Sequence, residues 1–250
     1  MHTPVSRAVE IIAHRGYSAK APENTLVALE AAVAAGADAV EFDVHTAACG
    51  TPVLFHDPML SRTTNGVGPV RRRTFEQLRT LDAGKWFSPE FAGERVPSYS
   101  EALGYLQGRI SRVYAEVKGF REFEDLDRMV RLTRDAGMLS DVVFISMNWT
   151  LLDRMRGQEP GLSIGYIVDD AGEIDEAVQR ATGDTSSLLD FRAALLTSDP
   201  SRAQRCLSQG IDMAVWTIDD PADASRLLDL GVRRITTNQV DDLLAWKAAL

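Results

Sequence analysis

The sequence contains few cysteines and no long hydrophobic run. The two cysteines, Cys49 and Cys206, are far apart and lack the spacing of a metal site, which indicates a reducing compartment. No apolar run approaches the roughly 18 residues that a membrane span requires. The segment before Ile11, MHTPVSRAVE, is not a charged-then-apolar signal segment, and we expect His2 within it to be disordered. These absences predict a cytoplasmic, soluble protein without stable membrane insertion.

Basic residues are also in the minority. Lys and Arg number 27 against 36 Asp and Glu, giving a net charge of −9, which excludes nucleic-acid binding through a basic surface. An anionic substrate requires a bound cation or local Arg and Lys side chains to reverse the field inside the site. The hydrophobic content of 45% and charged content of 25% are typical of a globular protein with a sizeable core.

A local pattern recurs along the chain: a helical stretch, a glycine and then a short β-branched or aromatic run. Gly36, Gly137, Gly210 and Gly231 fit the left-handed position just past a helix end. Eight strands alternating with helices predict an α/β fold of the (β/α)8 TIM-barrel type. The predicted strands are Glu10–Ala13, Ala39–Asp43, Arg112–Val117, Val142–Ser146, Ser163–Val168, Ser187–Asp190, Met213–Thr217 and Arg233–Thr236.

Two points of this prediction are open. The sixth strand is ambiguous because SSLLDFRAALLT can be divided between strand and helix in two ways. A doubly wound open sheet is the alternative fold, but the sequence lacks a Gly-rich phosphate loop after the first strand.

One stretch interrupts the alternation. Residues Pro52–Phe55 follow the second strand too closely for an intervening helix, so we expect them to pair beside it. Residues 57–108 are rich in turn residues and contain two short helical patterns. An irregular insertion of this length predicts a lid or binding subdomain within a single barrel domain of residues 1–250.

Acidic side chains gather where the strands end. Glu41 and Asp43 are two residues apart on one strand and therefore point to the same side, and Glu116 ends the third strand. Three carboxylates at the working face of a barrel suit a hard divalent cation, Ca²⁺ or Mg²⁺, better than zinc. The alternative is a pair of structural ion pairs, Glu41 with Arg15 and Glu116 with Lys118.

Histidines and cations end neighbouring strands. His14 and His56 fit a general acid and general base pair, although each alone could be a hydrogen-bonded structural residue. Arg15 and Lys118 stand beside these residues and indicate an anionic substrate group. Trp216 either stacks on an organic part of the substrate or packs in the core.

The order of the motifs resembles that of the glycerophosphodiester phosphodiesterase family. The likeness extends from Ile11 to about Lys118 and continues more weakly through Ser146, Trp216 and the final strand. The motifs are HRG followed by PENT, E-x-D, HD, L-x-RTT-x-G-x-G, LDAGKWF with GE-x-VP, and E-x-K.

The resemblance implies a barrel with a small inserted subdomain and a divalent cation, commonly Ca²⁺ or Mg²⁺. It implies hydrolysis of a small-molecule glycerophosphodiester to glycerol 3-phosphate and an alcohol. By position, it makes His14 and His56 the acid/base pair. The metal ligands it implies are Glu41, Asp43 and Glu116, and the substrate contacts are Arg15, Lys118 and Trp216, with Trp216 forming a wall of the glycerol pocket.

Two departures from the family pattern affect loops. The usual T-x-D-G after the second strand is Ala47-Ala48-Cys49-Gly50, and the closing strand runs into Asn238-Gln239-Val240 without a proline. Three other functions stay open: a family member that prefers lysophospholipids, a zinc hydrolase of amide or lactone bonds, and a non-catalytic barrel that binds a phosphorylated metabolite. The zinc hydrolase would need a His-x-His pair on the first strand, which the sequence lacks.

Overall fold

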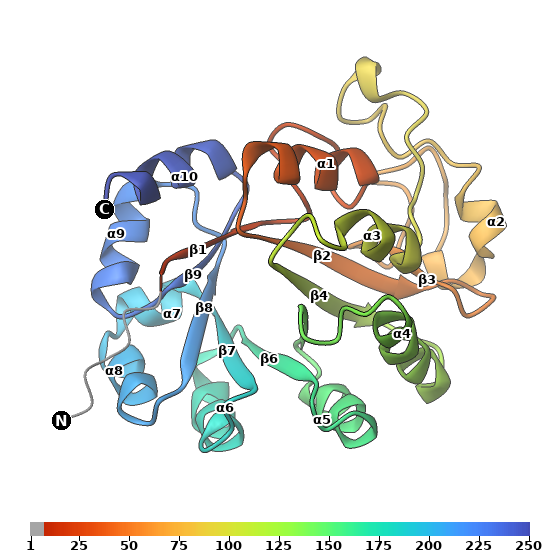
Figure 1. The fold of residues 1–250 in the computed structure, drawn as a ribbon. Helices are drawn as coiled ribbons and strands as arrows, with labels where there is room; N and C mark the ends of the chain where they lie inside the picture. The colour runs from red at the N-terminus through yellow and green to blue at the C-terminus, as the bar shows by residue number, and fades with distance from the viewer. Residues whose placement is uncertain (1–7) are drawn as a thin grey trace.

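The computed structural model describes residues 8–250, so the expectation for His2 lies outside the described residues. Eight parallel strands form a closed barrel with helices around it, which confirms the predicted fold class (Figure 1). Pairing between the first and second strands closes the ring. The barrel strands are β1 (Glu10–Ala13), β2 (Ala39–Thr46), β4 (Arg112–Gly119), β5 (Val142–Ser146), β6 (Ser163–Val168), β7 (Ser187–Arg192), β8 (Asp212–Trp216) and β9 (Arg234–Thr237).

All eight predicted strands are present, and the ambiguous one is settled. The sequence SSLLDFRAALLT divides after Arg192, where β7 ends and helix α7 begins. Burial of five consecutive residues before Arg192 explains why periodicity alone could not locate this boundary. The short strand β3 (Pro52–Leu54) pairs antiparallel with β2, as expected.

The helices cover the outer face of the barrel, and most of the core lies between the two layers. The predicted glycines do lie just past helices and have positive φ, from 66° at Gly137 to 91° at Gly231. Among the described residues, no helix combines the length and apolar character needed to cross a bilayer. The helices are α1 (Leu26–Ala35), α2 (Phe75–Leu78), α3 (Tyr99–Leu106), α4 (Phe123–Asp135), α5 (Trp149–Gln158), α6 (Ile174–Ala181), α7 (Ala193–Ser198), α8 (Ser201–Ser208), α9 (Pro221–Asp229) and α10 (Val240–Ala248), with 3-10 turns Val70–Arg72, Pro89–Phe91 and Ala171–Glu173.

The segment between β3 and α3 extends beyond the barrel and carries α2 (Figure 1). It packs around a small apolar core of its own that includes Phe55, Leu60, Val70 and Leu78. Helix α3, by contrast, packs against α1 and α4 and belongs to the barrel ring. The part outside the ring is therefore shorter than the predicted 57–108, because a capping box at Ser98 starts a barrel helix there.

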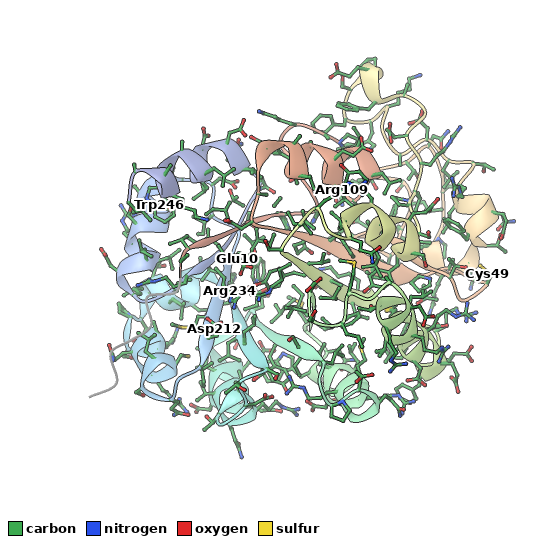
Figure 2. The ribbon with its side chains drawn as sticks, viewed as in Figure 1. Glu10, Cys49, Arg109, Asp212, Arg234 and Trp246 are labelled. Carbon is green, nitrogen blue, oxygen red and sulfur yellow. The ribbon has the colours of Figure 1, made fainter. Side chains whose placement is uncertain are left out.

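Charged side chains fill the barrel interior at the N-terminal end of its strands. Glu10, Asp212 and Arg234 lie together there, as Figure 2 shows. The Arg234 side chain, 13% exposed, pairs with Glu10 and lies 2.8 Å from Asp212. Arg234 also donates to the Tyr114 hydroxyl, which in turn donates to Glu10 over 2.8 Å. This network satisfies polar groups that would otherwise be buried without partners.

We expect Arg234→Met to lower the free energy of unfolding by about 3–5 kcal/mol, because it leaves Glu10 and Asp212 without their shared cation. Urea denaturation followed by circular dichroism measures this change. Arg226→Met is the matched control, since the Arg226 side chain is 71% exposed in its pair with Asp223 and should cost about 0–1 kcal/mol. Equal losses in the two variants would show that the network contributes no more than a surface pair.

Candidate active site

The C-terminal ends of the barrel strands enclose a cavity of about 180 Å³. Seven of the eight predicted site residues line it, and the eighth, Asp43, adjoins the lining carboxylates. The convergence follows from the topology, because parallel strands bring their C-terminal residues to one face of a barrel. The lining residues are His14, Arg15, Glu41, His56, Glu116, Lys118, Ile145, Met147, Ile167, Asp190, Trp216 and Thr236.

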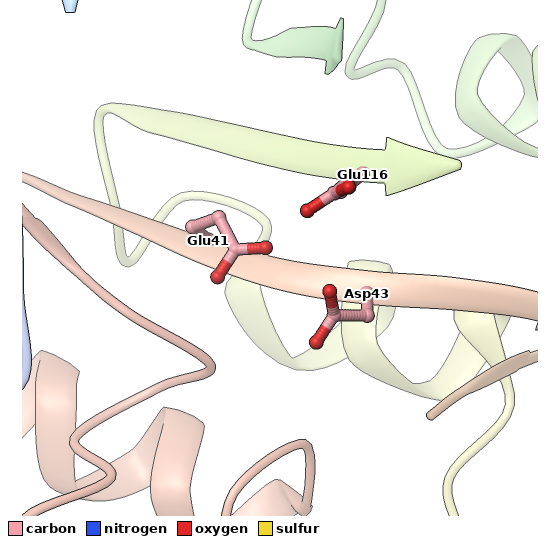
Figure 3. Close-up of side chains that lie close together, drawn as sticks. All are labelled: Glu41, Asp43 and Glu116. Atoms are coloured by element: carbon pink, nitrogen blue, oxygen red, sulfur yellow. The ribbon is translucent and has the colours of Figure 1, made fainter. Parts of the chain in front are cut away.

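Glu41, Asp43 and Glu116 form one cluster, shown in Figure 3. Asp43 and Glu116 are register partners on β2 and β4, and one oxygen from each of the three carboxylates lies within 4.8 Å of the others. Glu41 Oε1 is buried and has no hydrogen-bond partner among the described residues. An unpartnered buried oxygen among three carboxylates fits a hard divalent cation, so these residues suit the predicted metal.

The electrostatics of the cluster also favour a bound cation. Burial, followed by repulsion from Asp43, raises the pKa of Glu41 well above its usual value. The same two causes raise the pKa of Glu116 to about 7. Burial also disfavours charge on Asp43, but Arg15 and Lys118 outweigh it and lower the pKa of that carboxyl. Holding three carboxylates together therefore lowers the stability of the folded protein. A bound divalent cation would offset this repulsion.

The two predicted cations contact the cluster. Arg15 Nε lies 3.2 Å from Asp43 Oδ2, and Lys118 Nζ lies 3.5 Å from Asp43 Oδ1 and 2.6 Å from Glu116 Oε1. The ion pair between Glu116 and Lys118 that we considered as an alternative is thus present. The Arg15 side chain does not pair with Glu41; instead Glu41 Oε2 accepts the backbone N–H of Arg15 over 2.9 Å. Both cations face the cavity and remain available to an anionic ligand.

His14 is held by a neutral partner. Its Nδ1 lies 2.8 Å from Asn238 Oδ1, and the Asn238 amide donates to Asp219 over 2.9 Å, which fixes the amide oxygen toward the imidazole. Because an amide oxygen only accepts, His14 Nδ1 carries the proton and Nε2 is left as a proton acceptor. Burial and the charge of Arg15 lower the pKa of His14, which favours the neutral form.

His56 is held by an anion. Its Nδ1 donates to Asp57 Oδ1 over 2.6 Å, and Arg62 from the inserted segment contacts both oxygens of Asp57. The hydrogen bonds from Arg62 lower the pKa of Asp57, so this residue is a carboxylate at neutral pH. Arg62 also donates twice to Glu23, which connects it to Arg15. A proton added at Nε2 of His56 therefore produces a cation beside a fixed anion.

Several of these supporting residues were not predicted from the sequence. Asn24 donates to Asp43 Oδ2 over 2.7 Å and accepts the Asp43 backbone N–H, whereas the cap of α1 is Thr25. Asn238 follows the last predicted strand, but the sequence did not indicate that it contacts His14. Asp57 could have been found beside His56, but Arg62 and Asp219 reach their partners through loop geometry that no sequence spacing reveals.

The opposite side of the cavity is mostly apolar. Trp216 lines it and also packs against the barrel interior, as the core-packing alternative predicts, and contact with the substrate stays a prediction. Its indole N–H donates to the backbone carbonyl of Asp190 over 3.4 Å. The Asp190 side chain is buried, and burial raises its pKa to about 8. The sequence did not predict this residue because it ends the ambiguous sixth strand.

Neutralising one buried carboxylate should stabilise the cation-free protein. We expect Glu41→Gln to melt at a higher temperature than the wild type in EDTA at pH 8, by about 2–4 °C for each kcal/mol of relieved repulsion. The raised pKa of Glu41 means that the folded state holds this proton more tightly than the unfolded chain, so wild-type stability falls as the pH rises from about 4.5. The variant should lose less stability over that range and respond less to added Ca²⁺ or Mg²⁺, as thermal scans would show. A lower melting temperature in EDTA would contradict this account.

The chain matches the model of the glycerophosphoryl diester phosphodiesterase family over residues 14–242. It is 30% identical over 236 residues to a glycerophosphodiester phosphodiesterase of Caldanaerobacter subterraneus, an alignment that covers 94% of this chain and 96% of that protein. It is also 29% identical over 241 residues to a putative glycerophosphodiester phosphodiesterase of Bacillus subtilis, with coverage of 94% and 96%.

Solved structures agree. A glycerophosphodiester phosphodiesterase from Agrobacterium tumefaciens superposes with a TM-score of 0.80 at 30% identity, covering 97% of this chain and all of that one. A phosphodiesterase from Oleispira antarctica, in complex with the product sn-glycerol-3-phosphate, gives a TM-score of 0.85 at 28% identity with coverage of 95% and 96%. With the fold, the cavity and these matches in agreement, the chain belongs to the glycerophosphoryl diester phosphodiesterase family of hydrolases.

Proposed function

We propose that this enzyme hydrolyses glycerophosphodiesters to sn-glycerol 3-phosphate and an alcohol. The observation that carries the proposal is the cavity itself, in which two imidazoles with different supports face a cluster of two buried carboxylates and one half-buried one. The product complex of the Oleispira antarctica relative supports a glycerol-phosphate ligand. Glu41, Asp43 and Glu116 would hold the divalent cation, Ca²⁺ or Mg²⁺.

When bound, such a cation neutralises charge that develops on the phosphate oxygens. Arg15 and Lys118 contribute to the same neutralisation, because both face the cavity beside the cluster. Their contacts to Asp43 hold them in place before substrate arrives. Such preorganised charges cost little reorganisation during the reaction.

The different supports of the two histidines favour a different role for each. His14 Nε2 is unprotonated and takes the proton of the nucleophile, which is either the 2-hydroxyl of the glycerol unit or a water molecule. His56, whose imidazolium is supported by Asp57, gives its proton to the alkoxide that leaves when the phosphorus–oxygen bond breaks. Arg62 orients Asp57, so the inserted segment contributes a supporting residue to the site.

Purified protein incubated with glycerophosphocholine and glycerophosphoethanolamine tests the function through release of glycerol 3-phosphate. We expect release with Ca²⁺ or Mg²⁺ and none in EDTA. Restoration by Zn²⁺ alone would contradict the hard cation that the oxygen ligands of the cluster favour, and cleavage of an amide or lactone with Zn²⁺ but of neither diester would favour the zinc hydrolase. A cyclic phosphate detected at short times would identify the glycerol hydroxyl as the nucleophile: the alcohol leaves as the ring forms, and water then opens the ring to glycerol 3-phosphate. Release of glycerol 3-phosphate with no cyclic phosphate at any time in a single turnover would identify water as the nucleophile.

A second candidate, hydrolysis of lysophospholipids, is favoured by one observation. A groove of about 460 Å³ adjoins the cavity through Lys118 and is lined by apolar residues that include Met59 and Phe120. Met59 is 47% exposed, so an acyl chain could lie along it. Turnover of a lysophosphatidylcholine faster than that of glycerophosphocholine would favour this activity.

A further inference from the structure

We propose that Asp190 binds a hydroxyl group of the substrate's glycerol unit and thereby selects diesters that carry this hydroxyl. The inference rests on the proposed function and adds a specificity-determining residue to it. Asp190 Oδ1 is buried and has no hydrogen-bond partner among residues 8–250. Burying a polar oxygen without a partner costs free energy of folding, so such an oxygen at the wall of a cavity indicates a binding role.

The position of Asp190 places it across the barrel mouth from β2, although the charge of Glu116 on β4 still contributes to its raised pKa. It lies on β7, which is four strands away from β2 in either direction around the eight-stranded ring. Glu41 and Asp43 on β2 are therefore on the far side of the barrel mouth. A substrate whose phosphate contacts Arg15 and Lys118 must direct its organic part toward β7 if it is to fill the cavity.

The surroundings of Asp190 show which kind of group belongs there. Ile145, Met147, Ile167 and Trp216 line this half of the cavity, and Asp190 is the carboxyl group among them. The neighbouring indole N–H is already used by the Asp190 backbone carbonyl, so it does not satisfy the side chain. Apolar walls around one polar group match a short polyol, whose carbon chain contacts the walls while one hydroxyl reaches the carboxyl group.

A hydroxyl fits better than a cationic head group. The cavity of about 180 Å³ accommodates a three-carbon unit, whereas a quaternary ammonium group would be desolvated against apolar walls. The raised pKa of Asp190, about 8, supports this choice, because a protonated carboxyl group offers one donor and one acceptor to a hydroxyl. The indole of Trp216 then covers the carbon atoms.

The test compares two substrates in the wild type and in Asp190→Leu. One is glycerophosphocholine, and the other is the phosphocholine diester of 1,2-propanediol, which keeps the hydroxyl beside the phosphate-bearing carbon and lacks the terminal one. We expect Asp190→Leu to lower kcat/KM for glycerophosphocholine by about 10–100-fold. The kcat/KM for the propanediol diester should change by less than about 3-fold. Asp190→Asn, which keeps a donor and an acceptor, should retain most of the wild-type preference.

Binding of the products gives a readout apart from turnover. By calorimetry, Asp190→Leu should weaken the affinity for sn-glycerol 3-phosphate by about 10-fold or more. The affinity for 1,2-propanediol 1-phosphate should stay within about 3-fold of the wild type. Asp229→Leu, at the exposed end of α9, is the matched control and should change neither ligand. Thermal melting of each variant establishes that it is folded.

Three results would overturn the inference. Equal losses on both diesters would make Asp190 structural, and a loss confined to choline diesters, with glycerophosphoglycerol unaffected, would make it a head-group contact. Unchanged selectivity in the variant would exclude any role in recognition. If the wild type hydrolyses neither diester, the proposed function fails and this inference fails with it, a result distinct from the other three.

Discussion

Replacing His14 or His56 by alanine lowers kcat by about 10²–10⁴-fold, because each imidazole transfers a proton in the proposed reaction. The two variants should differ in their response to the leaving group. His56→Ala should recover with substrates such as p-nitrophenyl phosphodiesters, whose phenolate leaves without a proton. His14→Ala should remain slow on them, since its proton acceptor is still missing.

Steady-state kinetics with both substrate types measures this effect. Thermal shifts on addition of Ca²⁺ or Mg²⁺ should match the wild type in both variants, because neither histidine belongs to the carboxylate cluster. His45→Ala is a suitable control, since the His45 side chain contacts the backbone carbonyl of His56 and faces the outer groove, not the cavity. Near-normal turnover by either active-site variant would refute the acid/base assignment.

The second large effect is expected at Asp43. Asp43→Asn should weaken binding of the divalent cation and lower kcat/KM by more than about 100-fold. Even a residue that only supports a metal ligand typically costs about 10–100-fold in metal affinity or activity when it is lost. Asp43 is 1% exposed and is the shared partner of Arg15, Lys118 and Asn24. The substitution therefore removes one negative charge from the proposed cation site and weakens the ion pairs that hold the two cations proposed to bind the phosphate.

Calorimetric titration of the cation, compared with turnover at saturating cation, separates these two losses. If excess Ca²⁺ or Mg²⁺ restores full turnover, Asp43 serves only cation affinity. If turnover stays low at saturation, positioning of Arg15 and Lys118 contributes as well. Asp229→Asn, an exposed carboxylate, is the matched control. Wild-type cation affinity in Asp43→Asn would exclude this residue from the metal site.

The sequence determined the barrel because its local signals repeat. Glycines such as Gly36 end helices by adopting a left-handed backbone, and apolar strands follow them promptly. Strand ends then identify the site, since parallel strands place their C-terminal residues on one face. His14, Glu41, Glu116 and Lys118 could be selected in this way, as could the side that Asp43 shares with Glu41.

The tertiary structure decided how these residues are supported. The pairing of His14 with Asn238, and of His56 with Asp57, which Arg62 contacts in turn, distinguishes two histidines that are equivalent in the sequence. Asn238 is distant from His14 in the sequence, and Arg62 reaches Asp57 from the inserted segment, so these hydrogen bonds depend on backbone paths that local propensity does not encode.

Asp190 is a second case in which the sequence does not reveal the surroundings of a side chain. As the last residue of the ambiguous predicted strand, it carries only the strand-end signal that it shares with Glu116. Its role depends on burial and on the lack of a hydrogen-bond partner among the described residues. Both arise only when β7 joins the ring and its neighbours on β6 and β8 exclude water. Local chemistry and strand order thus follow from the sequence, whereas solvation and long-range hydrogen bonding follow from the closed barrel.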